Sequence, residues 1–231
     1  MQKKPLKINK PGIVAMMLER LLGLWQARQI RIAFEQRLAA TKSLLEIYST
    51  WRATAARNDL QNHVCILNIM QFAVLIYRDL STITHEILQP RHWQVHHVHM
   101  RLWALVIYEC FYDFHYLLGK DFRTAAQALE LDSVAHTVGK LNRSLNLIKD
   151  KHNGTVHEIR NTVIAHRELD ANRQLQVSDS ISLVEVSSLS RELEKWLDAL
   201  QEAFGPALDK VGRDLACSSP HKVNSPSGNP P

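Results

Sequence analysis

Apolar side chains recur every three or four positions along most of this chain. That is the spacing of one buried face of an α-helix. The first such segment covers residues 13–55 and includes Met17, Leu21 and Phe34. The pattern predicts one long helix here, or two helices joined near Gly23.

Caps and helix breakers divide the rest of the chain into further helices. Asn58 and Asp59 are good caps, so a second helix is predicted from there to about residue 89, where Pro90 forces a stop. A third helix is predicted over 92–118, followed by Gly119 as its C-terminal glycine. The later predicted elements are a short helix over 121–131, a helix from 132 or 133 that gives out at 166–169, a helix from the capping box Ser182–Glu185 to Gly205–Pro206, and a last short helix to about Leu215.

The placement of proline supports an all-α fold. Four of the eight prolines lie within residues 220–231, whereas strand-rich sandwiches and barrels need turn residues every dozen positions or so. With 45% hydrophobic residues, the chain is able to bury a core. We therefore expect a single helical bundle of about five to seven helices with a long N-terminal helix. Its predicted parts are a basic arm over 1–12, the helical domain over 13–216 and a disordered Pro/Ser-rich tail over 217–231.

Charge is unevenly distributed along the chain. Residues 1–57 hold eleven Lys or Arg against three Glu, and the whole chain has a net charge of +5. This basic N-terminal quarter suits an anionic partner, with nucleic acid first and a membrane surface second, although a basic arm also aids solubility. The three cysteines lack metal-type spacing and are expected to be reduced thiols. No apolar run reaches the ~18 residues that span a bilayer, so a cytoplasmic protein without membrane association is expected.

Two clusters of polar side chains are candidate sites outside any known motif. His92, His96 and His99 lie on one face of the predicted third helix, yet no carboxylate accompanies them, so a solvated or partner-facing stripe is favoured over a metal site. Glu109 and Asp113 are four residues apart on the same helix. They form either an acid–base couple, half of a two-metal site, or two acids hydrogen-bonded to neighbouring helices, of which the last is favoured.

A third candidate lies in residues 157–170, HEIRNTVIAHRELD. Arg160, followed directly by Asn161, and His166 are near the C-terminal end of a predicted amphipathic helix. This stretch resembles the motif of the HEPN superfamily, which is all-α and whose active members are metal-independent endoribonucleases marked by Arg, four to six residues, then His. The resemblance implies a homodimer in which two copies of the motif face each other across a cleft. It implies no metal and no cofactor.

The same Arg–His spacing occurs elsewhere in the chain. The other matches are Arg57–His63, Arg78–His85 and Arg91 with His96 or His97. Arg160 and His166 are preferred because only they close a long amphipathic helix in the second half of the chain. On a continued helix they would differ by about 120°, so the helix is expected to end or turn near His166.

These residue types suit RNA cleavage. Histidine takes or gives a proton near neutral pH, and a guanidinium stabilises charge on a phosphate. His166 and Arg160 are the predicted catalytic residues, and Asn161 has a supporting role. The sequence therefore favours an endoribonuclease of toxin–antitoxin or phage-defence type, controlled by a separate antitoxin or regulatory protein. The alternatives are a non-catalytic HEPN-like module that binds RNA, nucleotide or protein, and a helical adaptor at a membrane surface.

Overall fold

The computed structural model describes residues 13–88, 93–159 and 182–218, and this part consists of helices joined by short turns, without any strand. Six helices occur there: α1 (Ile13–Arg57), α2 (Gln61–Leu88), α3 (Trp93–Leu117), α4 (Lys120–Ala128), α5 (Asp132–Ile159) and α7 (Leu183–Ser218). The all-α prediction is thus confirmed for these residues. The predicted basic arm, and the predicted tail beyond Ser218, lie outside them.

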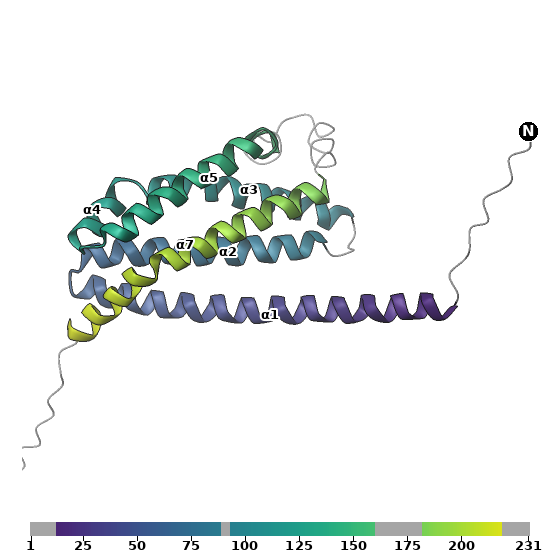
Figure 1. The fold of residues 1–231 in the computed structure, drawn as a ribbon, viewed down its shortest axis with the longest axis horizontal. Coiled ribbons are helices and arrows are strands. Elements are labelled where there is room, and N and C mark those ends of the chain that lie inside the picture. The colour runs from purple at the N-terminus through teal and green to yellow at the C-terminus, as the bar shows by residue number, and fades with distance from the viewer. Residues whose placement is uncertain (1–12, 89–92, 160–181, 219–231) are drawn as a thin grey trace, which may run out of the picture. The chain divides into compact units, whose positions relative to one another are not determined.

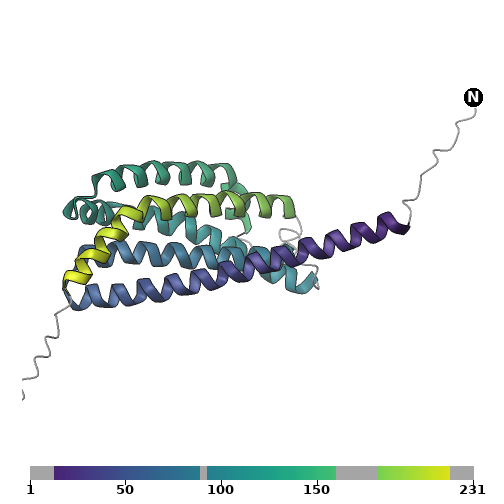
Figure 2. The ribbon, with the colours of Figure 1, turned by 60° about the horizontal axis from the view of Figure 1, so that its bottom comes forward.

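The chain divides into two compact units, Met1–Ala40 and Thr41–Pro231. In the second unit α2 packs against α3, α4 and α7, while α5 packs against α3, α4 and α7. Both ribbon views show α2, α3, α5 and α7 running alongside one another (Figures 1 and 2). The second unit is therefore a helical bundle with α2 among its most buried elements.

The bundle buries the apolar segments that the sequence marked as core helices. In α2 the residues Ile66, Leu67 and Met70 are fully buried, and in α3 Trp103 and Ile107 are fully buried. Of the described helices, only α2 is long and apolar enough to cross a membrane, with a mean hydropathy of 1.4 over its most apolar window. Half of that window is buried inside the bundle, which is the pattern of a core helix.

Helix α7 corrects the expectation that Gly205–Pro206 ends a helix. It runs without a break from Leu183 to Ser218 and contains Pro206. Proline removes one backbone hydrogen bond and bends a helix, and Figure 2 shows α7 changing direction between its green and yellow parts. Phe204 and Ala207, on either side of Pro206, are fully buried. Their burial holds the helix together across the bend, so the separate last helix that was predicted does not exist.

The backbone at two predicted helix boundaries differs from the expected geometry, although α2 begins at Gln61 and α3 ends at Leu117, within three residues of the predictions. Asp59, expected to cap the start of the second helix, instead adopts a left-handed backbone (φ 55°) at the end of α1, where the Leu60 N–H donates to the Ala55 carbonyl at 2.9 Å. Gly119 was expected to be the C-terminal glycine of the third helix, a position that commonly has a left-handed backbone, but its φ is −81°. Glycine is required there for space, because an added Cβ would lie 2.8 Å from the Tyr116 carbonyl oxygen.

Candidate functional site

The predicted catalytic residues Arg160, Asn161 and His166 lie outside the described residues. The structure describes the two helices that precede and follow them. Helix α5 is described as far as Ile159, the residue before Arg160, and α7 begins at Leu183. The contacts between these two helices are therefore the described structure nearest to the motif in the sequence.

A hydrogen bond from a side chain of α7 to the backbone of α5 joins these two helices. The Trp196 indole N–H donates to the Leu141 carbonyl at 2.8 Å, in the middle of α5. Leu145 and Leu193 are almost fully buried nearby in sequence on the same two helices. Because a helix carbonyl normally accepts from its own helix, this extra donor ties the two helices at a defined level.

An ion-pair cluster joins α5 to α7 nearer the candidate motif. The Lys151 ammonium donates to Glu192 Oε1 at 2.7 Å, and His152 Nε2 lies 3.6 Å from Glu192 Oε2. The hydrogen bond from Lys151 is the main reason that the pKa of Glu192 is lowered, with smaller contributions from the charges of Lys151 and His152 against the effect of burial. The His152 distance is too long for a good hydrogen bond, so this contact is mainly electrostatic.

The start of α7 is capped as the sequence predicted. The Glu185 backbone N–H donates to Ser182 Oγ at 3.0 Å, and the Val186 N–H donates to the Ser182 carbonyl at the same distance. Such a cap stabilises the first turn by about 1 kcal/mol. The predicted boundary between the motif-bearing segment and α7 is confirmed.

The competing pair Arg57 and His63 is directed away from a shared site. Arg57 Nε donates to the Ala53 carbonyl of its own helix at 3.2 Å, on the exposed side of α1. His63 is buried, and its Nε2 lies 2.9 Å from Asp214 Oδ2 of α7. Since the two side chains have separate partners, this pair forms a structural link between helices rather than a reactive couple.

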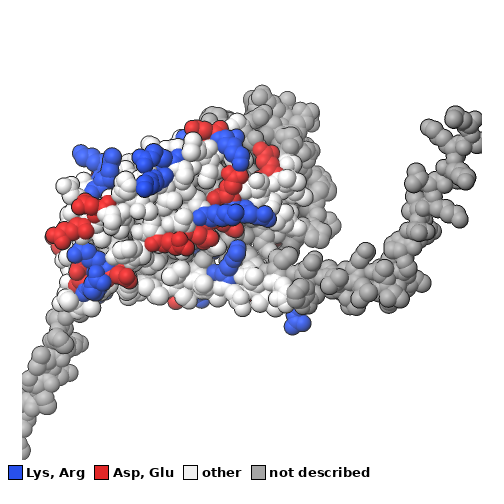
Figure 3. Space-filling model, viewed as in Figure 1, with Lys and Arg blue, Asp and Glu red and all other residues white. Residues whose placement is uncertain are grey.

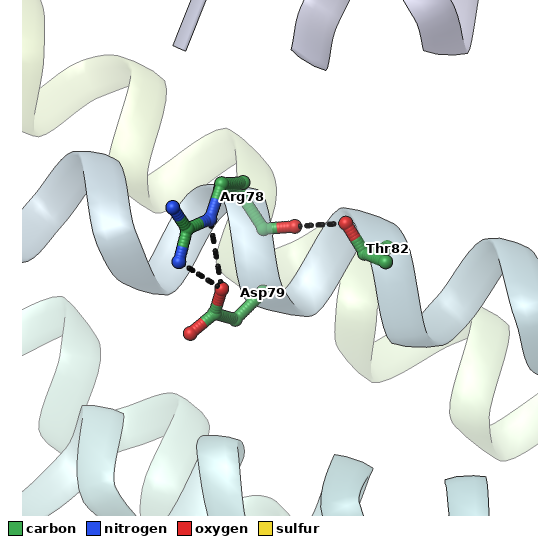
Figure 4. Close-up of polar contacts among 3 residues, drawn as sticks. All are labelled: Arg78, Asp79 and Thr82. Carbon is green, nitrogen blue, oxygen red and sulfur yellow. Dashed lines mark hydrogen bonds and ion pairs between the residues drawn. The ribbon is translucent and has the colours of Figure 1, made fainter. Parts of the chain in front are cut away.

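In the second competing pair, Arg78 and His85, the arginine bonds to its neighbour in the sequence. Arg78 donates from Nε and Nη2 to Asp79 Oδ1 at 3.0 and 2.9 Å, and the Thr82 hydroxyl donates to the Arg78 carbonyl at 2.7 Å (Figure 4). His85 lies two turns further along the same helix. Arg91, the third competing arginine, lies outside the described residues.

The histidine stripe is only partly described. His92 and the side chain of His96 fall outside the described part, and His99 is half-buried with no hydrogen-bond partner on Nδ1. Among the residues that the structure describes, no group of three His, Cys, Asp or Glu side chains is placed to hold a metal ion. The stripe thus has no described geometry that specifies a ligand.

The acidic pair on α3 was expected to bond to neighbouring helices, but both side chains are exposed. Glu109 and Asp113 are both exposed. The pKa of Glu109 is raised by partial burial first, then by the charges of Asp113 and Asp79. Among the described residues, no hydrogen bond joins either acid to a neighbouring helix, so the predicted pairing is not found there.

A cavity that sequence reasoning missed lies beside Asp113. It has a volume of about 340 Å³ between α1, α2 and α3, and its polar lining includes Arg52, Gln71 and Asn68. Arg52 Nη1 donates to Gln71 Oε1 at 3.3 Å. The local sequence gives no signal for this cavity, because its lining comes from three segments that are brought together only by the fold.

The comparisons with known proteins give no relative for this chain: no family model, curated protein or solved structure matches it.

Proposed function

We propose that this protein is a metal-independent endoribonuclease of HEPN type, in which Arg160 and His166 act at the RNA phosphate and Asn161 supports them. The observation that carries the proposal is the spacing of Arg160 and His166 in the segment between the described part of α5 and the capped start of α7. In the two competing pairs that the structure describes, Arg57, His63 and Arg78 have other partners, which supports this choice.

The chemistry follows from the residue types. Cleavage without a metal needs a group that removes the 2′-OH proton and one that stabilises negative charge on the phosphate. A histidine and a guanidinium fulfil these needs at neutral pH. Because the 2′-OH is the nucleophile, the activity is confined to RNA.

The basic N-terminal quarter of the chain, residues 1–57, supplies attraction to the RNA backbone that does not depend on sequence. On the face drawn in Figure 3, lysine and arginine side chains alternate with acidic ones over the described helices. This mixed surface gives no strong anion attraction of its own there, so residues 1–57 are the main electrostatic contribution. In this proposal the enzyme acts as a homodimer, and a separate antitoxin or regulatory protein restrains it in a toxin–antitoxin or phage-defence role.

The test is cleavage of a mixed-sequence RNA in excess EDTA by the wild type and by Arg160→Ala and His166→Ala. We expect cleavage by the wild type and a loss of at least about 100-fold in each variant, the scale of a lost acid–base or oxyanion-stabilising group. Arg57→Ala is the matched control, because Arg57-Asn58 precedes His63 at the same spacing and Arg57 is exposed. It also removes one of the eleven basic residues of 1–57, so its cleavage stays within about two- to threefold of the wild type, far from the loss expected at the motif.

A wild type that binds RNA and never cleaves it would contradict the enzyme and favour a non-catalytic RNA-binding module. Cleavage that disappears in EDTA would contradict the metal-independent mechanism. Equal loss in Arg57→Ala would show that the assay does not report on the motif.

A further inference from the structure

Helix α3 carries a row of large side chains on its outer face. The row consists of Val98, Leu102, Leu105, Glu109, Tyr112 and Tyr116, and we call it the α3 seam. Four of its apolar members are well exposed: Val98 52%, Leu102 43%, Tyr112 39% and Tyr116 77%. At about 100° per residue, the six positions lie within roughly 40° of the direction opposite the fully buried Ile107. The seam is therefore the face of α3 that is turned away from the bundle core.

The spacing of the α3 seam is that of helices that pair with other helices. Its members follow one another at four, three, four, three and four residues, which is a heptad pattern. A surface helix normally places polar residues on its solvent face, yet only Glu109 is charged here. Contiguous exposed apolar rows of this kind mark interaction surfaces.

The order of side chains in the seam indicates its occupant. The spacing is the same in both directions, so two copies of α3 laid antiparallel bring every seam residue opposite another. The N-terminal half is aliphatic and the C-terminal half contains the two tyrosines. Reversal therefore places Val98 opposite Tyr116 and Leu102 opposite Tyr112, pairing a smaller side chain with a larger one.

The single charge in the seam fits the same arrangement. In an antiparallel pair Glu109 faces Leu105, whereas a parallel pair in register places Glu109 against its own counterpart, which is unfavourable. The pKa of Glu109 is raised by partial burial and by Asp113 and Asp79, so its charge is already disfavoured in the single chain. The Lys149 ammonium lies 4.0 Å from the Tyr112 ring centre and brings a positive charge to the edge of the seam.

We propose that the α3 seam is a self-association surface, where a second copy of this chain binds with its own α3 antiparallel about a two-fold axis between Leu105 and Glu109. Two-fold symmetric pairs, in which both copies use the same patch, are the commonest soluble assemblies. The seam is about 27 Å long at 1.5 Å per residue, so it forms a small interface of micromolar rather than nanomolar strength.

The test is the mass of the full chain in solution without RNA, measured by light scattering during size exclusion. The proposed function also includes a homodimer, so a monomeric wild type would count against both, whereas a dimer that cleaves no RNA would contradict the ribonuclease alone. At about 100 µM protein, above the dissociation constants of small interfaces, we expect a wild-type mass near twice the 26.5 kDa of one chain. Leu102→Arg buries an unpaired charge in the seam and weakens association at least about 100-fold.

Two further variants make the outcome specific. Leu147→Arg is the matched control, since Leu147 is 71% exposed but lies on α5 outside the seam, and it remains dimeric. Glu109→Gln removes a carboxylate that the contact would bury and lowers the dissociation constant by about tenfold, a gain that misfolding does not explain. A monomeric wild type, a dimeric Leu102→Arg, or a Glu109→Gln variant that associates more weakly would each overturn the proposal.

Discussion

Replacing Ser190 by alanine tests how the described bundle is held together. Ser190 is 2% exposed, and its hydroxyl oxygen accepts two hydrogen bonds, from the indole N–H of Trp103 and from the hydroxyl of Thr84, both at 2.9 Å. These three side chains come from α7, α3 and α2. The hydroxyl of Ser190 is thus the common acceptor that links three helices at one level of the core.

The magnitude follows from what alanine leaves behind. The Trp103 indole is fully buried, so its N–H would lose its partner with no access to water, at a cost of about 1–3 kcal/mol. The lost bond from Thr84 adds about 1 kcal/mol. The expected total is about 2–4 kcal/mol, which corresponds to a fall of roughly 5–15 °C in Tm for a chain of this size.

The assay is urea unfolding followed by far-UV circular dichroism. Ser188→Ala on the same helix is the control, because Ser188 is exposed and its one contact, to Glu192, is long at 3.5 Å. We expect that control to stay within about 0.5 kcal/mol of the wild type. A Ser190→Ala variant equally close to the wild type would refute the assignment of Ser190 as a buried link.

Three further predictions concern local features of the fold. Gly119→Ala lowers the free energy of unfolding by about 1–3 kcal/mol, because the added Cβ meets a backbone carbonyl oxygen. Gly139→Ala raises the free energy of unfolding by about 0.5–1 kcal/mol, because the space around Gly139 is open and alanine favours a helix. Urea unfolding measures both changes. A thiol reagent at pH 8 labels the exposed Cys217 rapidly and labels Cys110 only after unfolding, because burial raises the pKa of the Cys110 thiol; peptide mass spectrometry reads out the sites. Glu192→Gln lowers the free energy of unfolding by at most about 1 kcal/mol at pH 7. Because the pKa of Glu192 is lowered in the folded chain, this difference between variant and wild type shrinks as the pH falls below the ordinary pKa of 4.5. Unfolding curves measured across pH 3–7 test the prediction.

The features that the sequence predicted correctly are those that depend on local pattern. Helical spacing of apolar residues marked the core of α2 and α3, and the Ser182–Glu185 box marked the start of α7. Both signals act over one or two turns of helix. These local predictions agree with the structure because the tertiary contacts of the bundle bury the same apolar faces.

The prediction at Pro206 was wrong because it considered the local rule alone. A proline inside a helix costs about 3 kcal/mol, so a stop was expected. The apolar positions Leu200, Phe204, Ala207 and Val211 continue at helical spacing through the proline, and all four are fully buried. Burial of several such side chains, at about 1.5–3 kcal/mol for each large one, exceeds the cost of the proline. That continuity was visible in the sequence and is the signal that would have corrected the prediction.

Features that join distant segments were not accessible from one sequence. The contact between His63 and Asp214 spans 151 residues, and the cavity beside Arg52 combines three helices. At Asp59 the left-handed backbone depends on how α1 and α2 meet, so its capping propensity was assigned to the wrong helix. The candidate motif at Arg160 and His166 remains a prediction from residue type and spacing.

The central claim, that the 2′-OH of RNA is the nucleophile in a reaction that needs no metal, is tested most directly by comparing two oligonucleotides of one sequence in EDTA. One is RNA and the other is its 2′-deoxy counterpart. We predict cleavage of the RNA alone, with products that end in a 2′,3′-cyclic phosphate and a 5′-hydroxyl. Cleavage of the deoxy strand, or an RNA that stays intact with the wild-type chain, would contradict the claim.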